Sequence, residues 1–161
     1  MKQFIVGWAI VLLSLNWLSY KQDNYMHQEQ MLRLKRVCQE AAVAGAQYFD
    51  KSQYRYGKYV FNQSEGTKAV EEIIKYNLKL DNNFVPLANT YWQDKITYTI
   101  TFLDDSNTVY PLLYTDPSGM LTHAITSPTV VIAINAGKTR YRLITNPPTA
   151  FRVSAHAWKT R

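Results

Sequence analysis

The sequence predicts an α+β protein in which an N-terminal transmembrane helix continues into a long stalk helix, followed by a second helix and an antiparallel sheet. Three observations carry this prediction: an uncharged apolar run near the N-terminus, a proline-free helical pattern after it, and a change of apolar period from 3.6 to 2 beyond residue 91. The chain has 161 residues, a net charge of +6 and one cysteine. We expect three parts: an anchor over 1–20, a stalk helix over 21–50 and an extracytoplasmic α+β head over 51–161.

The anchor is an apolar run over residues 4–18, FIVGWAIVLLSLNWL, that contains no charge. Polar residues up to Tyr20 extend it toward the about 20 residues that span a bilayer, and Trp17 suits the interface. Bulky residues occupy the positions where a cleavage site needs small ones, so an uncleaved anchor is favoured over a cleaved signal. A buried helix of a soluble protein is the third alternative. Lys2 on the leading side favours a cytoplasmic N-terminus and a head outside the cell membrane.

The stalk helix is predicted from residues 25–49, where apolar or small residues recur at steps of three and four. These residues are Met31, Leu34, Cys38, Ala41, Ala42, Gly45, Tyr48 and Phe49. Ala41, Ala42 and Gly45 permit close backbone approach, so a second element is expected to pack tightly against them. Two covers remain open at this point: the protein's own sheet, or a helix of another subunit in an assembly. Cys38 is interpreted as a small buried hydrophobe.

The head is predicted to begin with a helix over 65–80, whose apolar residues again follow the helical period. After residue 91, alternation of apolar and polar residues predicts an antiparallel sheet of about four to six strands. The predicted strands cover 95–103, 109–114, 121–126, 130–135, 139–144 and 151–158.

Catalysis is not expected from this composition. The three histidines lie on different predicted elements without ligand spacing, and no nucleophile motif occurs, so no catalytic, cofactor-binding or metal site is predicted. Residues 136–139 (AGKT) end like a phosphate-binding loop, but the earlier glycine of that motif is missing and a strand-like pattern follows. Gly137 is therefore assigned to a hairpin turn. The histidines are His27, His123 and His156.

Residues 117–161 carry lysines and arginines but no Asp or Glu. Several of these cations fall on predicted strands and form a candidate anionic-ligand face, which could meet anionic polymer, lipid headgroups or DNA. The alternative is an ordinary solvated sheet face, and nucleic acid is the less favoured partner because no nucleic-acid-binding motif occurs. The candidate residues are Lys138, Arg140, Arg142 and Arg152.

Residues 39–48, QEAAVAGAQY, resemble the Ala-rich segment of TadE/TadG-like pilus proteins of tight-adherence systems. The order of features is also similar: a membrane helix, the Ala-rich helix, a second helix at Lys68–Leu80, and strands. The resemblance implies a pilin-like fold and a non-enzymatic, membrane-anchored subunit of a bacterial pilus or secretion apparatus. Its implied partners are other pilin-like or apparatus subunits, including further copies of itself, and no small-molecule substrate.

Two functional hypotheses follow. In the first, the anchor and the contact residues Ala41, Ala42 and Gly45 pack against partner subunits. Replacement of Gly45 by Leu is then expected to abolish assembly while the head still folds. In the second, the chain is a cell-envelope binding module whose basic sheet face captures an anionic ligand in a salt-dependent manner.

Overall fold

A computed structural model describes residues 1–141 and 147–158 of the chain and has the predicted α+β architecture. Its helices are α1 (Lys2–Ala46), α2 (Lys51–Tyr54) and α3 (Gln63–Leu78). Its strands are β1 (Thr97–Leu103), β2 (Leu112–Thr115), β3 (Thr122–Ile125), β4 (Thr129–Lys138) and β5 (Thr149–Ala157).

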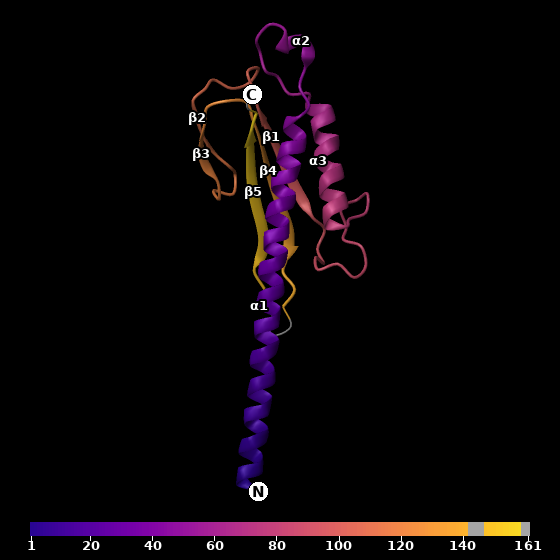
Figure 1. Ribbon diagram of the computed structural model, residues 1–161, viewed down its shortest axis with the longest axis vertical. Coiled ribbons are helices and arrows are strands. Elements are labelled where there is room, and N and C mark those ends of the chain that lie inside the picture. Colours follow the sequence, from indigo (N-terminus) through magenta and orange to yellow (C-terminus); the bar gives the residue numbers. More distant parts are fainter. Residues whose placement is uncertain (142–146, 159–161) are drawn as a thin grey trace.

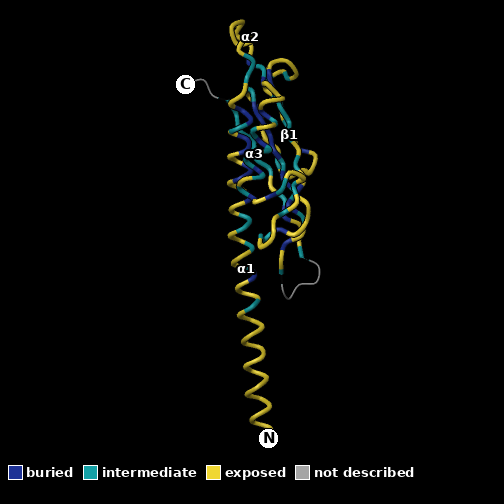
Figure 2. Tube along the Cα trace, turned by 90° about the vertical axis from the view of Figure 1, so that its right-hand side faces the viewer, coloured by how far each residue is buried: buried dark blue, intermediate teal, exposed yellow. Residues whose placement is uncertain are grey.

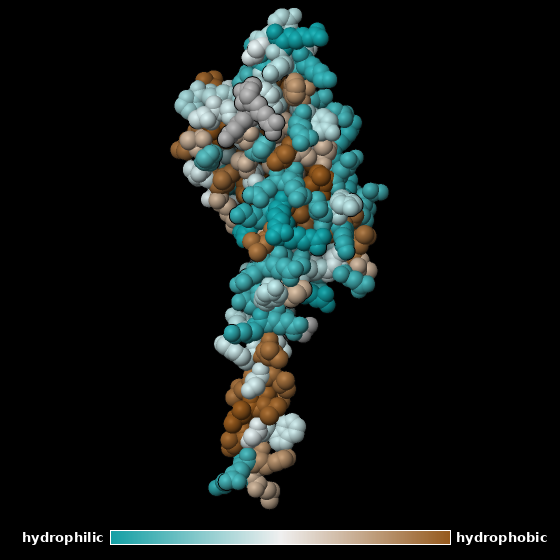
Figure 3. Space-filling view, viewed as in Figure 1, coloured by the Kyte–Doolittle hydropathy of each residue, from teal (hydrophilic) through white to brown (hydrophobic). Residues whose placement is uncertain are grey.

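Helix α1 joins the predicted anchor and the predicted stalk in one unbroken helix of 45 residues. Its N-terminal half projects from the head as a rod, and residues 1–18 are exposed along it (Figures 1 and 2). The rod is covered by hydrophobic side chains, whereas the visible face of the head is largely hydrophilic (Figure 3). By length and composition this helix can cross a membrane, as the apolar run predicts.

The C-terminal half of α1 packs with α3 on one face of a three-stranded antiparallel sheet. Strand β4 is central, with Ile132 opposite Ile100 of β1 and Ser154 of β5. Because side chains alternate across a strand, every second residue of β4 faces the helices, and Val130, Ile132 and Ile134 are fully buried there.

Helix α3 begins two residues earlier than the sequence predicts. Asn62 lies at its N-cap, and its side-chain oxygen accepts a hydrogen bond from Glu65 N at 3.2 Å. The helix ends at Leu78, because Lys79 adopts a left-handed conformation with φ 56°.

The α+β class and the antiparallel pairing are as predicted, but the main sheet has fewer strands than the predicted four to six. The main sheet has three strands in the order β1-β4-β5, and β2 and β3 pair separately as a two-stranded ribbon (Figure 1). The strand predicted over 139–144 is also not formed in its described part, since residues 139–141 belong to no strand. Residues 142–144 lie outside the described residues.

Gly137 is not in a hairpin turn, contrary to its assignment from the sequence. It lies inside β4, where the register with β5 shifts between Asn135 and Lys138 as in a β-bulge. Its φ is +73°, and a Cβ at this position would lie 2.4 Å from Asp94 Cβ. The Asp94 carboxylate occupies that space and accepts a hydrogen bond from Lys138 N at 2.7 Å. A glycine is needed here by both the conformation and the contact.

Candidate functional site

The small-residue face of α1 is covered from within the chain. Ala41 and Ala42 are fully buried, and a Cβ on Gly45 would lie 3.0 Å from Val70 Cγ2 of α3 and 3.3 Å from Val130 Cγ1 of β4. These residues leave no surface for a partner subunit, so the assembly contact predicted for them is misplaced. The sequence left two covers open, and the structure supplies its own sheet and second helix.

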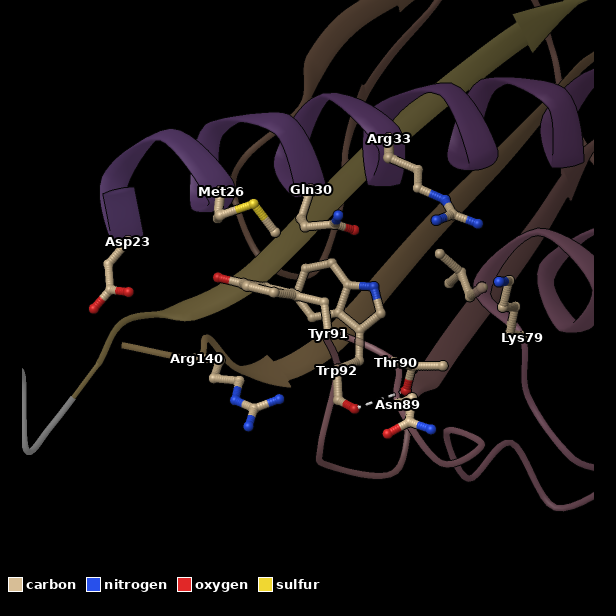
Figure 4. A pocket seen from close by; sticks show the side chains of 11 residues that line it. Asp23, Met26, Gln30, Arg33, Lys79, Asn89, Thr90, Tyr91, Trp92 and Arg140 are labelled. Atoms are coloured by element: carbon tan, nitrogen blue, oxygen red, sulfur yellow. Dashed lines mark hydrogen bonds between the residues drawn. The ribbon is translucent and has the colours of Figure 1, made fainter. Parts of the chain in front are cut away.

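A hollow of about 450 Å³ lies beside α1 at the end of the head nearest the anchor (Figure 4). Four segments that are distant in sequence contribute to it: α1, the end of α3, the loop before β1, and the segment after β4. Its lining residues are Asp23, Met26, Gln30, Arg33, Leu78, Lys79, Asn89, Thr90, Tyr91, Trp92 and Arg140.

The α1 wall of the hollow consists of Asp23, Met26, Gln30 and Arg33. Their spacing of three, four and three residues places them on one side of the helix. Asp23 is buried, although it follows the exposed anchor by only a few residues. The hollow therefore begins where α1 enters the head.

Three cations and one carboxylate line the hollow. Arg33 is oriented by α3, because its Nη2 donates a hydrogen bond to Asn77 O. Lys79 follows α3, and Arg140 follows β4; both are exposed. Figure 4 shows Arg140 toward the Asp23 end and Lys79 toward the Arg33 end. The surplus of positive charge suits an anionic group.

Tyr91 and Trp92 form an aromatic wall facing α1 (Figure 4). Trp92 is only 4% exposed, and Thr90 Oγ1 donates hydrogen bonds to Leu87 O at 2.8 Å and Trp92 O at 3.2 Å. Burial raises the pKa of Tyr91, which keeps its phenol protonated. Tyr91 is the partly exposed member of this wall and supplies the apolar surface beside the cations, whereas Trp92 is buried behind it.

The residues predicted to form the anionic-ligand face lie in different places. Arg140 lines the hollow, whereas Lys138 and Arg152 are exposed on β4 and β5 and do not line it. Arg142 lies outside the described residues. Strand alternation made Arg140 a candidate, but residues 139–141 form no strand. Arg33 and Lys79 line the same hollow as Arg140, and their distance in sequence kept them from being candidates.

The outward face of α1 carries a second feature that the sequence reading missed. Leu18, Tyr25, Leu32 and Val43 are between 36% and 69% exposed. At about 100° per residue they fall within about 40° of one another around the helix axis, opposite the buried face. We call these four residues the outer stripe. The seven-residue spacing of 18, 25 and 32 is the signal that could have revealed it.

Within residues 1–141 and 147–158, no group of three or more His, Cys, Asp and Glu side chains is arranged to hold a metal ion. Cys38 is fully buried, its Sγ donates to Ile132 O at 3.2 Å, and burial raises its pKa to about 12. A thiol in this state is a poor nucleophile.

Searches against protein families, curated proteins and solved structures find no match for this chain. Its function is therefore argued from its geometry.

Proposed function

We propose that this protein is a single-pass, membrane-anchored, pilin-like subunit that assembles with other helical subunits of a bacterial pilus or secretion apparatus. Its N-terminus lies in the cytoplasm, residues 1–20 span the cell membrane, and the head lies outside. Its role is structural and involves no catalysis. The resemblance of residues 39–48 to TadE/TadG-like proteins supports this proposal.

The observation that carries the proposal is the continuity of the outer stripe across the two halves of α1. Leu18 belongs to the anchor, whereas Leu32 and Val43 belong to the part of α1 that packs on the sheet. Apolar side chains thus remain exposed on one side of the helix beyond the membrane, where solvent alone would favour polar residues. A neighbouring helix running beside α1 would cover both parts.

The partner is a parallel helix of a second copy or of a related pilin-like subunit. Its orientation follows from the anchor, because subunits inserted in the same direction in one membrane present parallel helices. Glu29 and Arg36 are exposed, lie seven residues apart, and fall on the same side of the helix as the outer stripe, between its apolar members. In parallel copies offset by seven residues, about 10 Å along the axis, Glu29 of one copy would face Arg36 of the next, an offset that belongs to an assembled filament and not to two copies at one depth in the membrane. An exposed pair is worth at most about 1 kcal/mol, so it would set register more than affinity.

The proposal is tested by the size of complexes extracted from the native membrane in mild detergent. Wild type is expected to sediment as an assembly, and a double variant, Leu32→Glu with Val43→Glu, is expected to sediment as a monomer. Tyr76→Glu is the matched control, since Tyr76 is 84% exposed on α3, away from the outer stripe. A monomeric wild type, or equal effects of the double variant and the control, would contradict the proposal.

A further inference from the structure

We propose that the distal loop of the head, residues 50–60, binds single-stranded nucleic acid through one exposed tyrosine and three exposed cations. The loop consists of α2 and the turn that follows it, and it lies at the end of the molecule opposite the N-terminus (Figures 1 and 2). Binding here goes beyond the proposed function and does not require assembly with other subunits. Its failure would therefore leave the proposed function unchanged.

The distal loop is held as a compact unit by its own backbone. Asp50 N donates a hydrogen bond to Val60 O at 2.8 Å, which closes the loop at its base. Inside the loop, Lys58 N donates to Gln53 O at 3.2 Å, and Gly57 has a φ of +76°, a left-handed conformation that suits glycine. Side chains on this loop therefore have defined positions before a ligand arrives, which lowers the entropic cost of binding.

An aromatic cluster fixes the distal loop to the rest of the head. The ring centroid of Tyr54 lies 5.3 Å from that of Phe49 and 6.0 Å from that of Trp158. Tyr59 is only 5% exposed, and its ring centroid lies 3.9 Å from that of Trp158. Tyr56 belongs to the same loop but is 83% exposed. The buried rings stabilise the fold, whereas the Tyr56 ring is accessible to a ligand.

The distal loop carries three cations, all of them exposed: Lys51, Arg55 and Lys58. Residues 51–58, KSQYRYGK, contain no Asp or Glu. Two carboxylates contact the loop, and both accept hydrogen bonds from its backbone: Asp50 Oδ1 from Ser52 N at 2.8 Å, and Asp105 Oδ2 from Tyr59 N at 2.6 Å. The carboxylates thus face the loop itself, while the cations extend into solvent and can meet phosphate.

An exposed ring with cations beside it matches the chemistry of a single strand. Every base has a planar face that stacks on an aromatic ring whatever the sequence, and every phosphate attracts a cation. Arg55 and Lys58 are one and two residues from Tyr56, so their Cα atoms lie within about 4 and 8 Å of its Cα atom. A base stacked on Tyr56 would bring its flanking phosphates close to both cations. A duplex offers phosphates but keeps its base faces stacked inside, so the single strand is favoured.

The experiment measures binding of fluorescently labelled strands to the full-length protein in detergent by fluorescence anisotropy. The probes are oligo(dT), oligo(rU) and an abasic deoxyribose-phosphate chain, each about 15 nucleotides long, within the site sizes of single-strand-binding proteins. Wild type is expected to bind oligo(dT) and oligo(rU) equally, and about tenfold more tightly than the abasic chain, because stacking of a base on Tyr56 contributes about this factor.

Tyr56→Ala should lower the affinity for oligo(dT) to that for the abasic chain, and Tyr56→Phe should bind like wild type because it keeps the ring. Tyr76→Ala is the matched control, since Tyr76 is 84% exposed on α3, and it should not change the affinity. Equal binding of oligo(dT) and the abasic chain by wild type, or equal affinities of Tyr56→Ala and Tyr76→Ala, would overturn the proposal. Binding of oligo(rU) alone would also overturn it, because the 2′-hydroxyl would then carry recognition.

The role of the cations is tested by the dependence of affinity on salt. Three cations that neutralise phosphates of a single strand give a slope of about −2 in log K against log salt concentration. Arg55→Gln with Lys58→Gln should make this slope less steep by about 1.4. Lys95→Gln with Lys138→Gln is the control, since these exposed cations lie at the opposite end of the sheet from α2, and it should leave the slope unchanged. An affinity that does not fall with salt, or equal slopes in the loop variant and the control, would overturn the proposal.

Discussion

Replacement of Gly45 by Leu tests the contact between α1 and α3, where the two helices approach most closely. A Cβ on Gly45 would lie 3.0 Å from Val70 Cγ2, and one on Gly66 would lie 3.1 Å from Gly45 O. There is no room for a branched side chain between the two glycines. We therefore expect Gly45→Leu to destabilise the head itself, instead of abolishing assembly in a folded protein.

The magnitude follows from the distances at Gly45. Gly45→Ala gains about 1 kcal/mol of helix propensity and loses about 1 to 3 kcal/mol to overpacking, so its net effect is a loss of about 0 to 2 kcal/mol. Gly45→Leu adds three further carbons, which must push Val70 and Val130 away. We expect a loss of more than about 3 kcal/mol in the free energy of unfolding, which corresponds to about 10 °C in Tm for a chain of this size.

The assay is thermal unfolding of the full-length protein in detergent, followed by near-ultraviolet circular dichroism of its aromatic residues. Val43→Leu is the matched control, because Val43 lies two residues away on the exposed side of the same helix. Its Tm should stay within about 2 °C of wild type, as usual for a surface substitution. A Gly45→Leu protein that melts like this control would refute the described packing.

Three further predictions concern other residues. Gly137→Ala should lower Tm more than Gly119→Ala in the same melts. Both glycines have φ near +72°, but only at Gly137 would the added Cβ meet Asp94. Equal decreases in Tm for the two variants would contradict the described bulge. Burial raises the pKa of Cys38 to about 12, so its thiol should react slowly with Ellman's reagent at pH 8 until denaturant is added, and rapid labelling of the folded protein would contradict this. The free energy of unfolding should also fall as the pH rises from about 9 toward 12, because the thiol of the unfolded chain ionises first. The pKa of His27 is lowered by burial and by Arg152, so stability should fall as the pH decreases below about 6.5, and a His27→Gln variant that keeps the same pH slope would show that another group is responsible.

The helices and most strands could be predicted from the sequence because their patterns are local. The apolar run and the step of three and four residues predict α1, and the alternation in residues 97–103 predicts β1. The split into two sheets could not be predicted, since alternation shows that a strand forms and does not show its partner. The bulge at Gly137 depends on Asp94, which lies more than forty residues earlier in the chain.

The candidate site was predicted only in fragments for the same reason. The sequence indicated Arg140 as one of a series of cations. Arg33, Lys79 and Trp92 line the same hollow only because the fold brings their distant segments together. The small residues of α1 correctly indicated a close contact, whereas their partner, Val70 of α3, required the structure. Sequence patterns therefore identified which surfaces pack and left open what they pack against.

The central claim, that α1 meets a neighbouring helix through the outer stripe, is tested most directly by photo-crosslinking in intact cells. A photoreactive phenylalanine derivative replaces Leu32 in the full-length chain, and the same derivative replaces Tyr76 on α3 in the control. We predict that position 32 forms adducts with a second copy or with another chain that has an N-terminal apolar helix, and that position 76 does not. No protein adduct at position 32, or the same adducts at both positions, would contradict the claim.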